Sequence, residues 1–125
     1  MTKTSRFSYA ETLEKLKDAI ITAGNTVFAS IDQSAAARDA GLTLRPTTLL
    51  IFGNPKSGTP LMDAFPLVAL ELPLKLLIWD DGGKASLAYV PMSEIAARYG
   101  VTGVDARIDA MDRALDSLTR TVALP

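Results

Sequence analysis

The sequence predicts an α+β domain: a four- or five-stranded β-sheet with helices packed mainly on one face, plus a C-terminal amphipathic helix. Three features support this class. Residues Thr47–Phe52 form a strand-like run with almost no polar side chain. Residues Leu74–Tyr89 have the pattern of a β-hairpin, with turn residues at Asp80-Asp81-Gly82-Gly83. From Val104 onward, apolar residues recur at spacings of four and three, which is typical of a helix with one buried side.

Composition limits the classes of function. The 125 residues, 48% of them hydrophobic, suffice for one core, so we expect a single domain over residues 1–125. Thirteen basic and fourteen acidic residues give no electrostatic reason to bind nucleic acid or an anionic membrane. The chain has no cysteine and no histidine, so we expect no metal site, no cofactor and no recognisable catalytic residue. Without a signal-peptide pattern or an apolar run of ~20 residues, the expected location is the cytoplasm.

A helix and a strand are expected first. Ser8 and Glu11 have the spacing of a capping box, which predicts a helix start, and Gly24 supplies a common helix end. Thr26–Ile31 is rich in β-branched and aromatic residues. Because this segment is apolar on both faces, we expect it to be an internal strand.

The most apolar strand follows a short helix. Asp32 or Ser34 can cap this alanine-rich helix, and Gly41 ends it. Arg45-Pro46 then forces an extended backbone. Since Thr47–Phe52 offers no solvent side, we predict that it is the central strand and is buried on both faces.

The middle of the chain contains a loop and the hairpin. Gly53–Thr59 is predicted to be a loop, with Thr59-Pro60 opening the next helix. Residues Leu67–Leu72 show no pattern that assigns a structure. Within the hairpin, Trp79 and Tyr89 are expected to lie opposite each other, either as ordinary packing or as the wall of an apolar pocket.

Two helices complete the prediction. Pro91–Tyr99 is expected to be a short helix that Gly100 closes, and residues 104–123 form the C-terminal helix. Charged pairs four residues apart add only ~0.2–0.5 kcal/mol each, so this last helix must dock its apolar side on the sheet or on another chain. We expect part of that side to form a dimer contact. Its members are Val104, Ile108, Met111, Leu115, Leu118 and Val122.

Two stretches resemble a known family. The run LRPTTLLIFGNPKSGTPLM (Leu44–Met62), followed by LELPLKLLIWDD (Leu70–Asp81), resembles the bacterial domain-of-unknown-function family 302 over roughly Gly24–Gly100. The resemblance implies a compact α+β domain with helices laid on a sheet, and a homodimer. It implies no particular activity. Residues 1–103 would form the family core, with the C-terminal helix outside it.

One loop could bind a ligand. Gly53–Thr59 lies between a strand and a helix start, where backbone amides and the helix dipole favour anions. A nucleotide phosphate loop needs its lysine after the second glycine, whereas Lys56 precedes Gly58, so nucleotide binding is not expected. A weak anion site and a purely structural turn both remain open. With one strand-end acid and the hairpin aromatics, the candidate ligand residues are Asp32, Asn54, Lys56, Ser57, Gly58, Thr59, Trp79 and Tyr89.

The leading hypothesis is a small binding or interaction domain, homodimeric, that holds a small apolar or weakly anionic molecule. One alternative is an enzyme of unrecognised type that uses carboxylate, lysine or tyrosine chemistry, with Asp32, Glu71, Asp80 and Asp81 as the acids nearest strand ends. Another is a dimeric scaffold without a ligand. A polar pocket with shifted pKa values would favour the enzyme, an apolar pocket the binder, and no pocket the scaffold.

Overall fold

The computed structural model describes residues 1–125 and contains one five-stranded antiparallel sheet with strand order β1-β5-β4-β3-β2. The predicted α+β class, the sheet and the C-terminal helix are confirmed. The elements in chain order are β1 (Thr2–Thr4), α1 (Tyr9–Thr22), β2 (Thr26–Asp32), α2 (Gln33–Asp39), β3 (Thr47–Gly53), α3 (Pro55–Ala64), the 3-10 helix η1 (Pro66–Leu70), β4 (Leu74–Asp81), β5 (Lys84–Ala88), α4 (Met92–Arg98) and α5 (Asp105–Arg120).

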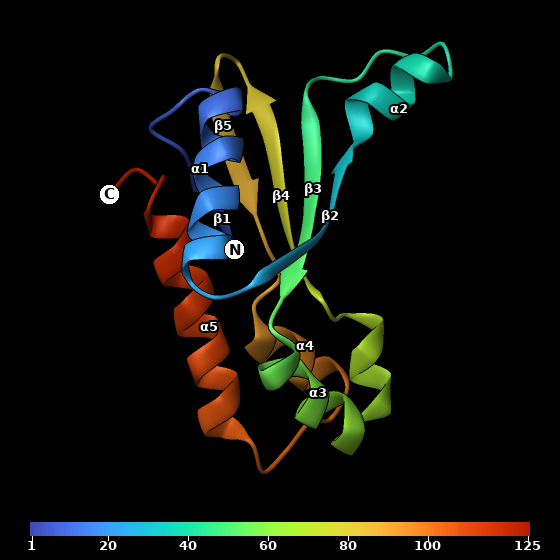
Figure 1. The fold of residues 1–125 in the computed structure, drawn as a ribbon, viewed down its shortest axis with the longest axis vertical. Coiled ribbons are helices and arrows are strands. Elements are labelled where there is room, and N and C mark those ends of the chain that lie inside the picture. The colour runs from blue at the N-terminus through green and yellow to red at the C-terminus, as the bar shows by residue number, and fades with distance from the viewer.

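The helices cover one face of the sheet and extend beyond both of its ends. α1 and α5 run alongside the sheet, α3, η1 and α4 gather at one end of it, and α2 projects beyond the other end (Figure 1). Side chains of β3 alternate accordingly: Leu50 and Phe52 are buried, while Leu49 and Ile51 are half-exposed. The sheet therefore has one face under helices and one face open.

The core lies between the covered face and the two long helices. Its fully buried members include Leu16 and Ile20 from α1, and it continues through α5. A second apolar cluster joins α3, η1, α4 and the first half of α5. The apolar side of the C-terminal helix is thus buried within the chain, except for Val104, which is half-exposed. The sheet and α4 cover this side within the chain, so only Val104 on it is left accessible to another chain.

Two strand predictions need correction. The run at β3 is internal but not central, since β4 occupies the middle of the sheet, and it is buried on one face only. The segment predicted as an internal strand is β2, which is one of the two edge strands. A bulge between Val27 and Ala29 leaves Phe28 52% exposed. A single helical layer cannot cover both faces of a sheet, so apolar residues on the second face stay accessible.

The predicted loop at residues 53–59 is mostly helical. α3 begins at Pro55, and the Asn54 side chain caps it by accepting a hydrogen bond from the Lys56 amide at 3.0 Å. Asn54-Pro55 and Thr59-Pro60 carry the same start signal, a capping side chain followed by proline at the first helical position. The earlier of the two begins the helix, and Pro60 lies inside it.

The hairpin is confirmed, but its aromatic pair is not. Gly82 and Gly83 form a two-residue turn, and their φ values of 66° and 98° are ones that residues other than glycine rarely adopt. This tight turn fixes the register so that Trp79 lies opposite Ser86. Tyr89 follows the end of β5 and is buried, so it does not face Trp79.

The helix caps came out largely as predicted. Ser8 caps α1 by accepting from the Glu11 amide at 3.3 Å, and Asp32 caps α2 by accepting from the Ala35 amide at 2.9 Å. The Ser34 hydroxyl donates to the Asp32 carboxylate and accepts from the Thr47 amide, which ties α2 to the start of β3. The segment without a predicted structure begins as η1.

Candidate functional site

A surface pocket with about 180 Å³ of accessible volume, called the cavity below, lies where α3, the adjoining ends of β2 and β3, the start of β4 and the middle of α5 meet, and its rim includes the exposed residues Phe28 and Ala114. Its walls are mainly apolar. Neutral polar side chains complete the lining, among them Asn25, Ser57 and Thr59. The principal apolar residues are Phe52, Met62, Leu72, Leu74, Leu115 and Leu118.

The α3 wall is built by its cap. Asn54 accepts three hydrogen bonds from the first turn of α3: its side chain takes the Lys56 amide, and its carbonyl takes the Ser57 and Gly58 amides at 2.9 and 3.1 Å. Pro55 has no amide hydrogen to offer. The helix start therefore presents no free donor in this turn, which removes the amides that an anion site would need.

Gly58 gives the cavity part of its volume. A Cβ atom built there would lie 3.7 Å from Met62 Cε and 3.8 Å from Leu72 Cδ1, which is ordinary van der Waals contact. The backbone at Gly58 does not require glycine, because its φ lies outside the left-handed region. The space beside Gly58 is consequently available to a ligand and could also be filled by a methyl group.

The cavity is electrically neutral. Its lining includes no aspartate, glutamate, lysine, arginine or tyrosine. Lys56 is exposed and lies outside the lining. An uncompensated charge would lose its hydration on entering such a space, whereas an apolar molecule would gain from leaving water.

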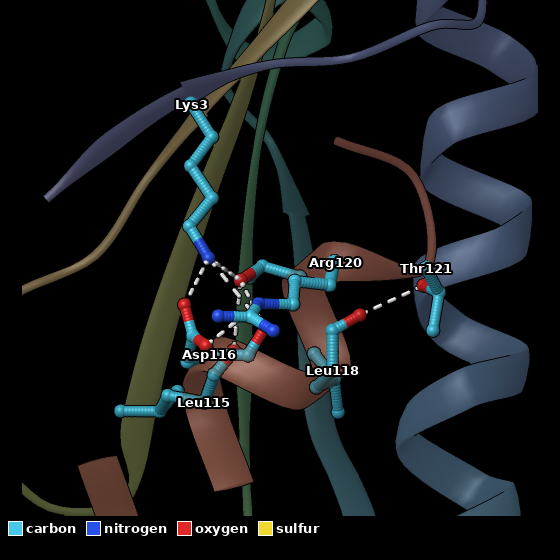
Figure 2. A network of polar contacts seen from close by, with 7 residues as sticks. Lys3, Leu115, Asp116, Leu118, Arg120 and Thr121 are labelled. Carbon is cyan, nitrogen blue, oxygen red and sulfur yellow. Dashed lines mark hydrogen bonds and ion pairs between the residues drawn. The ribbon is translucent and has the colours of Figure 1, made fainter. Parts of the chain in front are cut away.

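Three side chains have shifted pKa values, and none of them lines the cavity. The Ser34 hydroxyl and the Ala35 amide lower the pKa of Asp32. A hydrogen bond from Lys3 lowers the pKa of Asp116, in the network that Figure 2 shows between β1 and α5. The hydrogen bond from the Tyr99 hydroxyl to Glu71 raises the pKa of Tyr99. Each shift arises mainly from a local hydrogen bond: a helix cap at Asp32, an ion pair at Asp116 and a side-chain contact at Tyr99.

The structure brings half of the predicted ligand residues together. Those that line the cavity all come from the cap and first turns of α3: Asn54, Ser57, Gly58 and Thr59. Lys56 lies in the same turn but is not part of the lining. No group of three acidic residues gathers as a metal site.

The other predicted ligand residues lie elsewhere. Asp32 ends β2 and caps α2, near the opposite end of the sheet. Trp79 pairs with Thr47 and Ser86 on the open face. Tyr89 lines a separate, shallower hollow of about 420 Å³ together with Leu49 and Leu77.

Most lining residues could not be recognised from the sequence. Phe52, Leu74, Leu115 and Leu118 belong to strand and helix patterns that predict ordinary core positions. A core residue and a cavity-lining residue have the same spacing, since both face inward. Only the way in which α3 and α5 meet the sheet leaves a space between them.

The sequence profile of the family described as "Domain of unknown function DUF302" matches residues 1–118. A solved structure described as "uncharacterized conserved protein DUF302 from Bacillus stearothermophilus" superposes with a TM-score of 0.89 at 17% sequence identity, covering 98% of this chain and 96% of that one. This likeness shows that the fold is shared. Both matches extend into α5, so the expectation that the C-terminal helix lies outside the family is wrong.

Similar sequences occur in larger proteins. The chain is 38% identical to "Fluoride-specific ion channel FluC 1" of Brucella suis biovar 1 (strain 1330), over 98% of this chain and 49% of that protein. It is equally similar to the protein of that name from Brucella abortus biovar 1 (strain 9-941), over 46% of its length. The chain thus spans about half the length of the curated relatives it matches. None of its own helices has the length and apolar content to cross a bilayer. The chain belongs to the DUF302 family.

Proposed function

We propose that this chain is a small-molecule binding module that holds an uncharged, largely apolar molecule in the cavity, and that it acts as a homodimer. The observation that carries the ligand proposal is the neutral, mainly apolar cavity of about 180 Å³. For comparison of size, an enclosed engineered cavity of ~150 Å³ lined by leucine, isoleucine and phenylalanine binds benzene. A ligand the size of a benzene ring with one or two substituents fits this volume.

The chemistry of the lining supports binding over catalysis. General acid and base groups must lie within hydrogen-bond reach of the reacting atoms, and this cavity has no titratable side chain. Its neutral hydroxyl and amide groups, such as Ser57 and Asn25, can orient one polar substituent. The weakly anionic ligand considered from the sequence has less support, because Lys56 and the first-turn amides do not serve the cavity.

A pair of related aromatic probes tests this proposal. Toluene and benzoate share a ring, but only benzoate is charged at pH 7. We expect toluene to shift the amide resonances of α3 and α5 saturably and to raise the melting temperature, as a ligand of the folded state does. Benzoate should do neither. Ala114 lines the cavity, whereas Ala10 is exposed on α1, so Ala114→Leu should abolish toluene binding and Ala10→Leu should not. Toluene binding that survives Ala114→Leu would overturn the proposal.

A second candidate role comes from the relatives. The region that this chain matches accounts for about half of proteins named as fluoride channels. The segments of an ion channel that cross the bilayer must satisfy all their backbone hydrogen bonds internally. We propose that this region is a ligand-responsive module beside the conducting segments, which would lie in the other half. Fluoride itself is a poor ligand for a neutral apolar cavity, because it would lose strong hydration there.

Fluoride binding is directly measurable. Titration with sodium fluoride, against sodium chloride at equal ionic strength, should give no saturable amide shift at residues 54–61. A saturable shift specific to fluoride would make the ion the ligand and would replace the apolar molecule proposed above.

A further inference from the structure

The sheet face away from α1 and α5 is apolar and uncovered. Partly exposed residues on this face come from two of the three inner strands, β3 and β4: Leu49, Ile51, Leu77 and Trp79. Ile31, 39% exposed, and Ala88 extend the patch across β2 and β5. Helix α4 borders this side at Ile95, next to Leu49 and Leu77, and the rest of the face has no helix over it. Contiguous apolar patches of this kind mark interaction surfaces.

We infer that two copies of this chain pack these open faces together, sheet on sheet. Their two-fold axis would lie between the two sheets, parallel to them and perpendicular to β4, near Ile78. The inference rests on the homodimer proposed above and names its surface. Sheets that pack face to face lie ~10 Å apart with their apolar faces in contact, and such packing would cover the open face of this sheet.

Charge on β4 selects the direction of the axis. Side chains alternate along a strand, so the open face of β4 presents Lys75, Leu77, Trp79 and Asp81 in order. An axis across the strand near Ile78 places Lys75 of each copy opposite Asp81 of the other and Leu77 opposite Trp79. An axis along the strand would instead place Lys75 opposite its own copy. The first arrangement pairs unlike charges twice, and the second sets like charges against each other.

The area of the open sheet face is sufficient for a specific interface between two copies. The strands have 3, 7, 7, 8 and 5 residues. At ~4.8 Å between strands and ~3.4 Å per residue, they give the whole sheet face a footprint on the order of 500 Å² per copy. Two such faces together reach the ~1,000 Å² that a specific interface needs. The patch is self-complementary about a two-fold axis, as an interface between identical chains must be.

The single tryptophan makes the interface observable. Trp79 is the only tryptophan of the chain and is half-exposed in one copy. Dilution of the wild type should therefore shift its emission to longer wavelength as dimers dissociate. In sedimentation velocity, Leu77→Glu should be a folded monomer. Ile21→Glu, at a 61% exposed position on α1, should remain a dimer.

Charge reversal tests the axis. Lys75→Asp and Asp81→Lys should each weaken the dimer, and the double variant Lys75→Asp/Asp81→Lys should restore it. A dimer that Leu77→Glu leaves intact would overturn this surface while leaving the homodimer in place. A wild type that stays monomeric at every concentration would overturn both. Toluene binding by the Leu77→Glu variant tests the cavity independently of the dimer, because Leu77 is not part of the cavity lining.

Discussion

The ammonium of Lys3 lies 2.8 Å from Asp116 Oδ1, joining the first strand of the sheet to the last helix across 113 residues of sequence. The same nitrogen donates to Thr119 Oγ1 at 2.7 Å, and Arg120 Nε lies 2.8 Å from Asp116 Oδ2 (Figure 2). β1 has only three residues, so few backbone bonds hold it. The ion pair therefore fixes a short edge strand and the end of α5 together.

This pair predicts a contribution to acid sensitivity. Lys3 lowers the pKa of Asp116 in the folded state, so folding gains stability from the ionised carboxylate above the unfolded pKa of ~3.9. That stability is lost as pH falls through the lower, folded pKa. Urea melts at pH 7 and pH 3 should show a smaller pH-dependent loss for Asp116→Asn than for wild type. Asp109→Asn, at an exposed position without an ion pair, is the control and should leave the loss unchanged. Equal losses for all three proteins would contradict the assignment.

Asp112 should act as the cap of α4. Its two carboxylate oxygens accept from the Met92 and Ser93 amides at 2.6 and 3.1 Å, while the residue at the cap position, Pro91, offers no side-chain acceptor. Asp112→Ala should cost about 0.5–2 kcal/mol of unfolding free energy, the usual value of a lost cap. Asp112→Asn, which keeps an acceptor, should cost less. Denaturant melts in which the two variants are equally unstable would show that the oxygen is not what matters.

Gly58→Ala should stabilise the fold and weaken ligand binding at once. Alanine at a helical position with a compatible φ gains about 0.4–1 kcal/mol over glycine. The added methyl group would project beside Met62 and Leu72 into the cavity. Thermal melts should therefore rise while toluene affinity falls. Asp63→Ala, exposed near the end of the same helix, provides a propensity change without a cavity change and should leave affinity intact.

Alanine substitutions at two neighbouring positions on β3 should differ sharply in the unfolding free energy that they cost. Leu50 is 0% exposed under the helices, so Leu50→Ala should cost about 2–5 kcal/mol. Ile51 is half-exposed on the open face, so Ile51→Ala should cost less when the protein is dilute. Equal costs in dilute urea melts would mean that both faces of β3 are buried within one chain.

Local signals made much of the fold predictable. The serine at position 8 and the aspartate at position 32 cap helices through their own side chains, and the Gly82-Gly83 turn fixes the hairpin. These interactions span only a few residues, so spacing alone reveals them. The cap of α4 was invisible in the sequence because Asp112 supplies it from another helix, twenty residues away.

Tertiary relationships were harder to predict. The apolar run at β3 was expected to be buried on both faces, yet an apolar pattern does not reveal how many helical layers cover a sheet. Likewise, Asn54 and residues 56–59 were recognised as ligand candidates for their position at a helix start, whereas the cavity beside them depends on α5, which is distant in the sequence. The lining residues Leu115 and Leu118 look like any other core positions until the helices are placed.

Xenon pressurisation of crystals tests the apolar cavity most directly, because xenon enters dry apolar space and is displaced where polar groups hold water. We predict one xenon atom bounded by Phe52, Met62 and Leu115, with no water hydrogen-bonded inside. In Gly58→Ala crystals its occupancy should fall. A cavity filled by ordered waters bonded to Asn25 and Ser57, with no xenon at any pressure, would contradict the proposed apolar ligand site.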